Sequence, residues 1–273
     1  MERRWIPKLA MARAAAPMLR GLRGETRTTS SRSAWEGVSK VRFYCRAGLK
    51  EYPYRILGGC MAAVEWTKEL FGQAEALCRV AHESARRGWV PATAGNFSFR
   101  DEASGRIFIT ASGLDKGAIV PADLLEIDAE CRVLAGVGRP SAETALHGVI
   151  YRERPGTRAI VHVHTVWNTL LSDRFAAEGA VPLEGYELLK GLSGVGTHEH
   201  RELVPILDNS QEYPGLAREL AGALERCPAA HGVLLRRHGL YTWGQSVAEA
   251  RRHLEALEFL FEVEGRRLSG AFG

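Results

Sequence analysis

The stretch AIVHVHTVW, residues 159–167, places two histidines, His162 and His164, two positions apart within an apolar segment. In a β-strand alternate side chains lie on the same face, so both imidazoles would point one way from backbone positions roughly 6.6 Å apart. From there two ring nitrogens can converge on one zinc ion, which binds histidine nitrogen at about 2.0–2.1 Å. The same spacing also fits a hydrogen-bonded pair of histidines in a protein core, and the local sequence leaves both interpretations open.

A catalytic zinc ion usually has three protein ligands and one open position, so a third ligand is needed. His238 ends the apolar stretch HGVLLRRHG, residues 231–239, and the glycine after it indicates a sheet edge that opens onto a cleft. We therefore predict His238 as the third ligand. His147 follows Glu143 by one helical turn, so these two side chains could face the same pocket.

Two glycine- and hydroxyl-rich turns could bind the anionic part of a ligand. They are TAGNFS, residues 93–98, and TASGLDKG, residues 110–117. Backbone N–H groups in such turns form concave anion sites, and Lys116 adds a positive charge that can reach a phosphate. Neither turn matches GxxxxGK[ST] or GxGxxG, so an ordinary nucleotide or dinucleotide site is not indicated.

The rest of the sequence predicts interleaved helices and strands. Helices are predicted near residues 65–88, over 142–154 with Ser141 as the N-cap, after residue 164 as far as Leu170, from Tyr213, and over 247–268. Strands are predicted at 106–112, 124–128, 131–136, 159–164, 180–184 and 231–239. Because these elements do not form strict βαβ repeats, we expect a three-layer α/β/α sandwich around a mixed sheet. His82 and His253 lie on amphipathic helices and are expected at the surface or at an interface.

The positive charge of this 273-residue chain is concentrated near its start. Residues 1–60 contain 13 Lys/Arg against 4 Asp/Glu, whereas the remainder contains 23 against 28. A transit peptide, a nucleic-acid-binding arm and upstream DNA translated from a start codon placed too early all fit this leader. Gly58-Gly59 requires GGN-GGN codons just before Met61, where a bacterial ribosome-binding site would lie. We therefore favour a misplaced start and expect an unstructured leader, 1–60, before a single domain, 61–273.

Composition also indicates the cellular compartment of the protein and excludes some classes of partner. Five scattered cysteines without a CxxC pair indicate a reducing compartment, and we expect the cytoplasm. No stretch approaches the ~20 apolar residues of a membrane span, and the acidic body does not favour a nucleic-acid partner.

The motifs GNFSFR, ITASGLDKG, PSAETALH, IVHVHT and LLRRHG, in this order, resemble the class II aldolase/adducin family over residues 62–268. The resemblance implies a largely antiparallel mixed sheet, a zinc ion (Zn2+) held by His162, His164 and His238, and a homotetramer with sites near subunit interfaces. It also implies phosphate binding by six residues: Gly95, Asn96, Ser112, Gly113, Lys116 and Ser141.

Three further stretches, GWVPATAGNFS, EGYELLKGL and PILDNSQEY, are similar to members of the family that remove water from a small-molecule 2-keto sugar phosphate. The position of Glu187 is the general acid/base in those dehydratases, so we expect Glu187 to protonate the departing hydroxyl. Glu143 matches the catalytic glutamate of the sugar-phosphate aldolases in the family, and here it would be a second acid/base or a transient metal ligand. A sugar-phosphate aldolase or epimerase, and an adducin-like interaction module without metal chemistry, are the alternative functions.

Overall fold

The computed structural model describes the backbone at 38–45 and 48–55, and the whole of residues 63–270. The strands β1 (Val38–Cys45) and β2 (Gly48–Arg55) form a two-stranded sheet. Both lie within the leader expected to be unstructured, so that expectation is wrong for these two strands. The alternation of Val41, Phe43 and Cys45 with polar neighbours in β1 is the period-two pattern that favours a strand. The other residues of the leader lie outside the described part of the chain.

One nine-stranded sheet organises the body, in the order β6-β5-β4-β3-β7-β11-β10-β9-β8. Within it β9 and β10 pair in parallel, and every other neighbouring pair is antiparallel. The expected mixed, largely antiparallel sheet is therefore confirmed. Its strands are β3 (Asn96–Arg100), β4 (Ile107–Thr110), β5 (Leu124–Ile127), β6 (Val133–Ala135), β7 (Ala159–Val163), β8 (Ala180–Glu184), β9 (Arg201–Leu207), β10 (Gly232–Leu235) and β11 (Gly239–Gly244).

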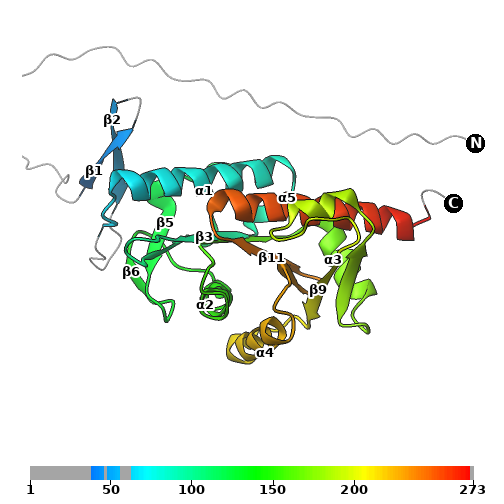
Figure 1. The fold of residues 1–273 in the computed structure, drawn as a ribbon. Helices are drawn as coiled ribbons and strands as arrows, with labels where there is room; N and C mark the ends of the chain where they lie inside the picture. The colour runs from blue at the N-terminus through cyan, green and yellow to red at the C-terminus, as the bar shows by residue number, and fades with distance from the viewer. Residues whose placement is uncertain (1–37, 46–47, 56–62, 271–273) are drawn as a thin grey trace, which may run out of the picture. The chain divides into compact units, whose positions relative to one another are not determined.

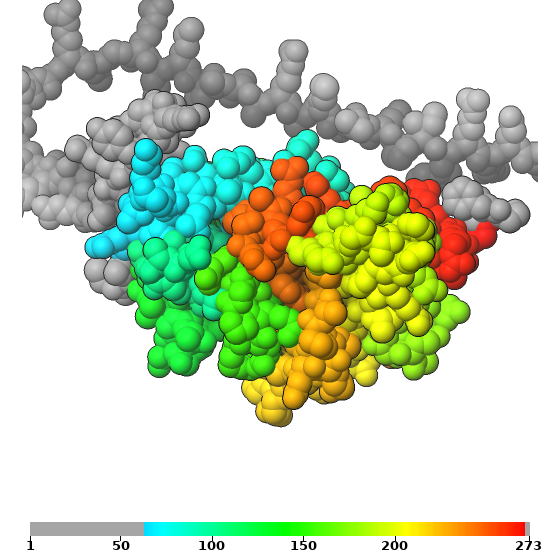
Figure 2. Space-filling model, viewed as in Figure 1, coloured from blue at the N-terminus to red at the C-terminus, as the bar shows by residue number. Residues whose placement is uncertain are grey.

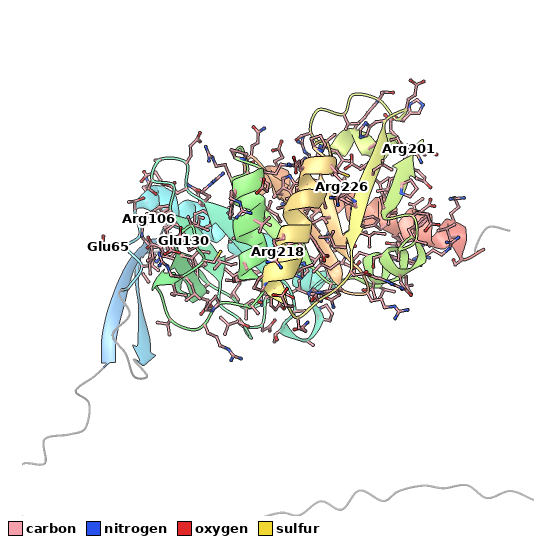
Figure 3. All side chains as sticks on the ribbon, turned by 90° about the horizontal axis from the view of Figure 1, so that it is seen from below. Glu65, Arg106, Glu130, Arg201, Arg218 and Arg226 are labelled. Atoms are coloured by element: carbon pink, nitrogen blue, oxygen red, sulfur yellow. The ribbon has the colours of Figure 1, made fainter. Side chains whose placement is uncertain are left out.

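Helices cover both faces of this sheet and complete the three layers (Figure 1). On one face lie α1 (Lys68–Arg86), α3 (Val166–Arg174) and α5 (Val247–Leu268). Figure 2 shows α1 and α5 beside each other there, with the segment near residue 190 against α5. On the other face lie α2 (Thr144–Glu153) and α4 (Tyr213–Arg226), seen from below in Figure 3, where Arg218 and Arg226 mark α4. Three short 3-10 turns lie in the connections: Pro91–Thr93, Pro121–Asp123 and Glu187–Gly191.

Each face of the sheet has its own hydrophobic core. Phe97, Phe99 and Phe108 pack with α1 and α5, and Phe99 stacks on Phe108 with ring centroids 4.9 Å apart. Ile160 and Tyr241 pack instead with α2 and α4. Because β7 is central and covered on both faces, all five of its side chains are buried. A polar side chain in β7 therefore needs a partner within the protein.

Several boundaries differ from the sequence prediction. The stretch 231–239 is not one strand, because the apolar run ends at Leu235 and two arginines then turn the chain, with Arg237 at φ +54°. Strands β3, β9 and β11 were not predicted. Ser141 is not the N-cap of α2, since Glu143 occupies that position and Ser141 forms the preceding turn through a bond from Glu143 N to its Oγ, 3.3 Å.

The length of one helix and the burial of one helical histidine also differ from the sequence prediction. The helix after His164 continues to Arg174 rather than ending at Leu170. His253, expected at the surface or at an interface, is instead buried within the subunit, because its ring lies on the side of α5 that faces the sheet and bonds to Trp243 O, 2.7 Å. Within the described residues, no helix combines the length and the apolar character needed to cross a membrane.

Candidate functional site

Two histidines at the end of β7 form the centre of the candidate site. Val161 and Val163 pack into the core of α1 and α5, so the alternating His162 lies on the opposite face, where the Tyr241 ring stacks on it at 3.8 Å. His164 follows directly after the strand, and its Nε2 lies 2.9 Å from His162 Nε2. The HxH spacing thus brings the two imidazoles together, as the sequence predicted.

The third histidine reaches the same place from another part of the chain. His238 lies in the turn between β10 and β11 rather than at the end of a strand. Its ring centroid is 5.2 Å from that of His162 and 4.6 Å from that of His164. Because β11 pairs with β7, the turn that begins β11 lies beside the end of β7 where His164 stands.

A carboxylate completes the cluster. Glu143, at the start of α2, lies with Oε1 2.9 Å from His238 Nε2 and with Oε2 3.6 Å from His162 Nε2. One ligand atom from each of these four residues lies within 4.8 Å of all the others. Among the described residues this is the one group of histidine, cysteine and acidic side chains that converges in this way.

The donor set of this cluster fits a zinc ion. Three imidazole nitrogens with a nearby carboxylate are ligands that Zn2+ commonly takes in proteins. His162 Nδ1 donates to Leu240 O, 2.9 Å, so its Nε2 presents a lone pair to the cluster, and His238 Nδ1 is held by Asn209 Oδ1 at 3.1 Å. Outer hydrogen bonds of this kind orient metal-binding histidines and fix their tautomers. His162, His164 and His238 could therefore hold the metal.

The electrostatics of the cluster suit a cation. Burial holds the pKa of His162 well below its ordinary value and lowers that of His164 to about 4, so both rings are neutral near pH 7. Burial would raise the pKa of Glu143, but the hydrogen bond from His238 and the surrounding imidazoles lower it to about 2. His162 and His164 therefore present neutral nitrogen donors, and Glu143 adds one negative charge.

A cavity of about 240 Å³ lies beside the cluster, with Glu143 and His164 in its wall. The two glycine-rich turns form much of the rest of the cavity wall. The structure thus brings to this cavity all six residues expected to bind phosphate: Gly95, Asn96, Ser112, Gly113, Lys116 and Ser141.

Lys116 is the charged member of this set, and its side chain is buried. The residue is 1% exposed, and burial lowers its pKa. Its Nζ donates to Thr93 O at 3.0 Å and to Leu114 O at 2.9 Å. Thr93 has φ +64°, and the bond from Lys116 holds this left-handed turn in place. An ammonium group has three N–H donors, so one remains for an anion in the cavity.

Glu187 is the predicted site residue that the structure does not bring to the cluster. Its side chain is 72% exposed, it pairs with Lys190 Nζ at 2.6 Å, and it is not part of the cavity wall. The hydrogen bond from Lys190 lowers the pKa of Glu187, so the carboxyl is ionised in the isolated subunit.

Two residues that sequence reasoning missed shape the centre. The Tyr241 ring covers one face of His162. Gly239 leaves the room that His162 occupies, since a Cβ there would lie 2.3 Å from Val163 O and 2.9 Å from His162 Cε1. The glycine after His238 is the sequence signal for this close approach, and it begins β11 rather than ending a strand.

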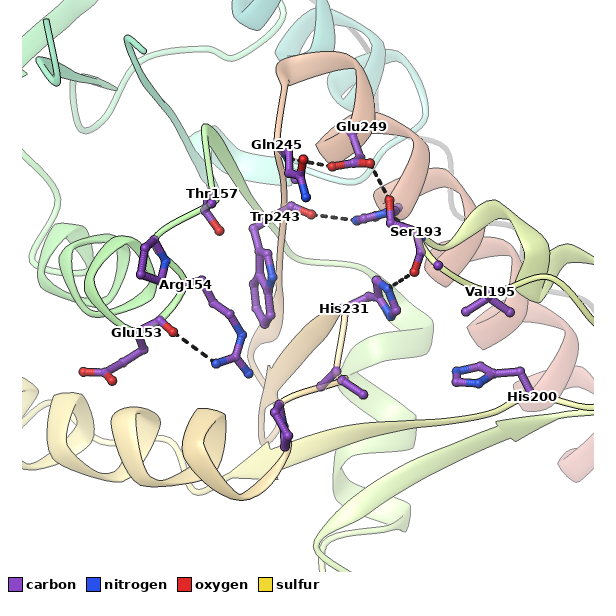
Figure 4. Close-up of a pocket in the computed structure, with 18 residues that line it drawn as sticks. Glu153, Arg154, Thr157, Ser193, Val195, His200, His231, Trp243, Gln245 and Glu249 are labelled. Carbon is purple, nitrogen blue, oxygen red and sulfur yellow. Dashed lines mark hydrogen bonds between the residues drawn. The ribbon is translucent and has the colours of Figure 1, made fainter. Parts of the chain in front are cut away.

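A larger cavity, about 440 Å³, also contains histidines (Figure 4). Two of the lining histidines bond to Glu202, which is buried behind them: Glu202 accepts from His231 Nδ1, 3.1 Å, and from His200 Nε2, 3.0 Å, while His231 Nε2 donates to Ser193 O, 2.8 Å. Both nitrogens of His231 face acceptors, so the ring is a cation. Burial opposes this charge, but the contact with Glu202 raises the pKa of His231. Both ring nitrogens of His231 are therefore engaged in hydrogen bonds within the protein and are not free to bind a metal ion.

The α/β/α fold, the three-histidine and carboxylate centre and the adjoining anion turns define a metal-binding protein with a site for a small anionic ligand. Residues 75–264 match the sequence model of the Class II Aldolase and Adducin N-terminal domain. The chain belongs to that family, as its motifs predicted.

Relatives and solved structures agree with this assignment. The chain is 51% identical, over 66% of its length and 86% of the relative, to the methylthioribulose-1-phosphate dehydratase of Methylococcus capsulatus. It is 44% identical, over 71% of its length and 87% of the relative, to that of Yersinia pestis. An L-fuculose-1-phosphate aldolase structure from Thermus thermophilus matches with TM-score 0.58 and 29% identity, over 73% of this chain and 97% of that one.

Proposed function

We propose that this protein is a zinc-dependent hydro-lyase. It removes water from 5-methylthioribulose 1-phosphate to give 2,3-diketo-5-methylthiopentyl 1-phosphate, a step of methionine salvage. The observation that carries this proposal is that the metal-binding cluster and the anion-binding turns share one cavity. The names of the relatives support this choice of substrate.

The turns would hold the phosphate end of the substrate. Backbone N–H groups next to Gly95 and Gly113, with φ +76° and +78°, form concave anion sites. The remaining N–H of Lys116 adds a positive charge. The phosphate is thereby fixed, and the reacting carbons can reach the histidine cluster beside it.

The chemistry at these carbons needs a polarised ketone and two proton transfers. A zinc ion held by His162, His164 and His238 would supply a Lewis acid for the substrate C2 carbonyl. The C3–H and C4–O bonds break, and water leaves. The ionised Glu143, beside the cluster, would accept a proton, and a carboxylic acid must donate one to the departing C4 hydroxyl. The resulting enol becomes the diketone by moving a proton from oxygen to C4.

We assign the donation to Glu187, acting from a neighbouring subunit. In its own subunit Glu187 is exposed and held ionised by Lys190. Burial of a carboxyl group between subunits raises its pKa and favours the protonated form. Apolar side chains are also exposed near both regions: Leu188 is 39% exposed, and Val166 and Leu170, just after His164, are 69% and 54% exposed. Subunit contacts bury such surfaces, so the site would be complete in a homotetramer.

Mixing two inactive variants tests this arrangement. If His162→Ala and Glu187→Gln subunits assemble at random in a 1:1 mixture, about a quarter of the sites combine intact histidines with an intact Glu187 from a neighbour. About a quarter of the wild-type activity should then return. A mixture of His162→Ala with Glu143→Gln is the matched control and should stay inactive, because these residues share one subunit. Equal inactivity of both mixtures would place Glu187 in its own subunit's site, and an active Glu187→Gln protein would place it outside catalysis.

The function itself is tested by product analysis with methylthioribulose 1-phosphate. We expect one diketone phosphate, formed without an aldehyde, and loss of turnover after chelation that zinc restores. The alternative is a sugar-phosphate aldolase, since solved relatives carry that name and Glu143 lies in the cluster. An aldehyde and dihydroxyacetone phosphate would identify it, and wild-type protein without bound zinc would favour the adducin-like module.

The free cysteines indicate the cellular compartment of the enzyme. Cys78, Cys131 and Cys227 are free thiols, which supports a reducing compartment, and we assign the protein to the cytoplasm.

A further inference from the structure

A continuous line of buried hydrogen bonds leads away from Glu143 into the core. Asn96 Nδ2 donates to Glu143 Oε2, 2.6 Å, and Asn96 Oδ1 contacts His147 Nε2. On the other side of that ring, His147 Nδ1 lies 2.7 Å from Ser98 Oγ, which lies 2.8 Å from Tyr151 Oη. None of the four residues beyond Glu143 is more than 3% exposed.

The fold explains why these side chains form a line. Asn96 and Ser98 alternate along β3 and therefore lie on the same face of the sheet, and Asn96 pairs directly with His162 of β7. That face is covered by α2, which carries His147 and Tyr151 one helical turn apart. The line thus joins one face of β3 to one stripe of α2.

Donors and acceptors along the line can be assigned only one way. The ionised Glu143 accepts, so the NH2 of Asn96 faces it and the amide oxygen of Asn96 faces His147. That oxygen also only accepts, so Nε2 of His147 carries the proton. The ring is fully buried and hydrogen-bonds to no carboxylate, so it is neutral and its Nδ1 accepts from Ser98. Tyr151 then donates to Ser98, and every donor points toward the metal centre.

We propose that His147 is a positioning residue: its Nε2–H fixes the amide of Asn96 so that the NH2 group, not the oxygen, faces Glu143. A flipped amide would set its oxygen against the carboxylate and turn an acceptor toward the cavity that Asn96 lines. The inference rests on the zinc centre of the proposed function and extends the site by one residue behind Asn96. Its tests measure tautomer and zinc affinity, so they remain valid if the substrate assignment is wrong.

The first test is the tautomer of His147 in the full-length wild-type protein, read by nitrogen-15 NMR with labelled histidine. We expect the Nε2–H form. The Nδ1–H form would overturn the proposal whatever the enzyme's activity.

The second test compares variants by the dissociation constant for zinc, measured by competition with a chromogenic chelator. Asn96 holds Glu143, whose carboxylate lies 2.9 Å from His238 Nε2 and 3.6 Å from His162 Nε2. Substitution of residues behind metal ligands commonly weakens metal affinity 10–100-fold, and we expect the lower end, about tenfold, for His147→Leu, which acts through this line. In His147→Gln the side-chain amide can donate to Asn96 and accept from Ser98, so affinity should return to within about threefold of wild type. A merely structural role predicts no such rescue.

The matched control is Tyr151→Phe, which removes one hydrogen bond from the same buried line but leaves the link between His147 and Asn96 intact. Zinc affinity should change by less than about threefold. The proposal fails if His147→Leu binds zinc within threefold of wild type, or if His147→Gln is as weak as His147→Leu. If His147→Leu does not fold, the tautomer of His147 and the comparison of zinc affinity between His147→Gln and Tyr151→Phe still test the proposal.

Discussion

Replacing Gly239 with alanine tests the packing that holds the metal-binding histidines. The added Cβ would lie 2.3 Å from Val163 O and 2.9 Å from His162 Cε1, whereas real Cβ atoms do not come closer than 3.0 Å. Since one of these neighbours is backbone, it cannot rotate away, and β11 must move from β7 by roughly 0.7 Å, the difference between 3.0 and 2.3 Å.

This movement disturbs two of the three histidines. His238 directly precedes Gly239, and His162 Nδ1 donates to the oxygen of the next residue, Leu240. Overpacking a tight core costs about 1–3 kcal/mol, which lowers the melting temperature by roughly 2–12 °C in a domain of this size. Misplacing the bond behind His162 should also weaken zinc binding, by about 10–100-fold.

Thermal unfolding and chelator competition measure the two effects separately. Gly156→Ala is the control, because a Cβ there meets nothing within 4 Å, and its stability should stay within about 0.5 kcal/mol of wild type. Gly239→Ala could instead have the same melting temperature and the same zinc affinity as the wild-type protein. In that case the close approach of β11 to β7 does not hold the histidines in place, and this reasoning is refuted.

Two further variants have defined outcomes. Lys116→Met removes the charge from the anion cavity and leaves the carbonyl of Thr93 without its partner, so the KM should rise about tenfold while zinc affinity is unchanged; an unaltered KM would exclude contact between Lys116 and the phosphate. For His231, folding raises the pKa, so the stability it contributes is full below its ordinary value of 6.5 and is lost as the pH rises through the folded pKa. The paired Glu202 has a lowered pKa and contributes above its ordinary 4.5. The difference in melting temperature between wild type and His231→Gln should therefore be larger at pH 6 than at pH 9, and a constant difference would show that the ring is not charged.

The parts of the site that the sequence could predict are local ones. Two histidines two apart in an apolar strand must share a face, so the pairing of His162 with His164 follows from strand geometry alone. Strand β3 was missed because its first residue, Asn96, directly follows the left-handed Gly95, so the segment has the composition of a turn. Strand β11 was missed because a tight turn, through Arg237, separates it from β10.

Other parts depend on contacts that no local pattern contains. Glu143 joins the histidines because the start of α2 lies over the end of β7, which is set by how α2 packs on the sheet. In the proposed arrangement Glu187 acts from a second subunit, so neither the sequence nor the structure of one subunit would determine its place. The line behind Asn96 requires the register of β3 against β7, which only the folded sheet reveals.

Metal binding at this cluster also depends on folding and stabilises the folded chain. Its four side chains come from α2, the end of β7 and the turn before β11, so an unfolded chain does not hold them together. In the proposed zinc-bound state, an ion present at 100 times its dissociation constant adds about 2.7 kcal/mol to the free energy of unfolding. When zinc is scarce, the cell would then lose folded protein to degradation as well as the activity of each molecule.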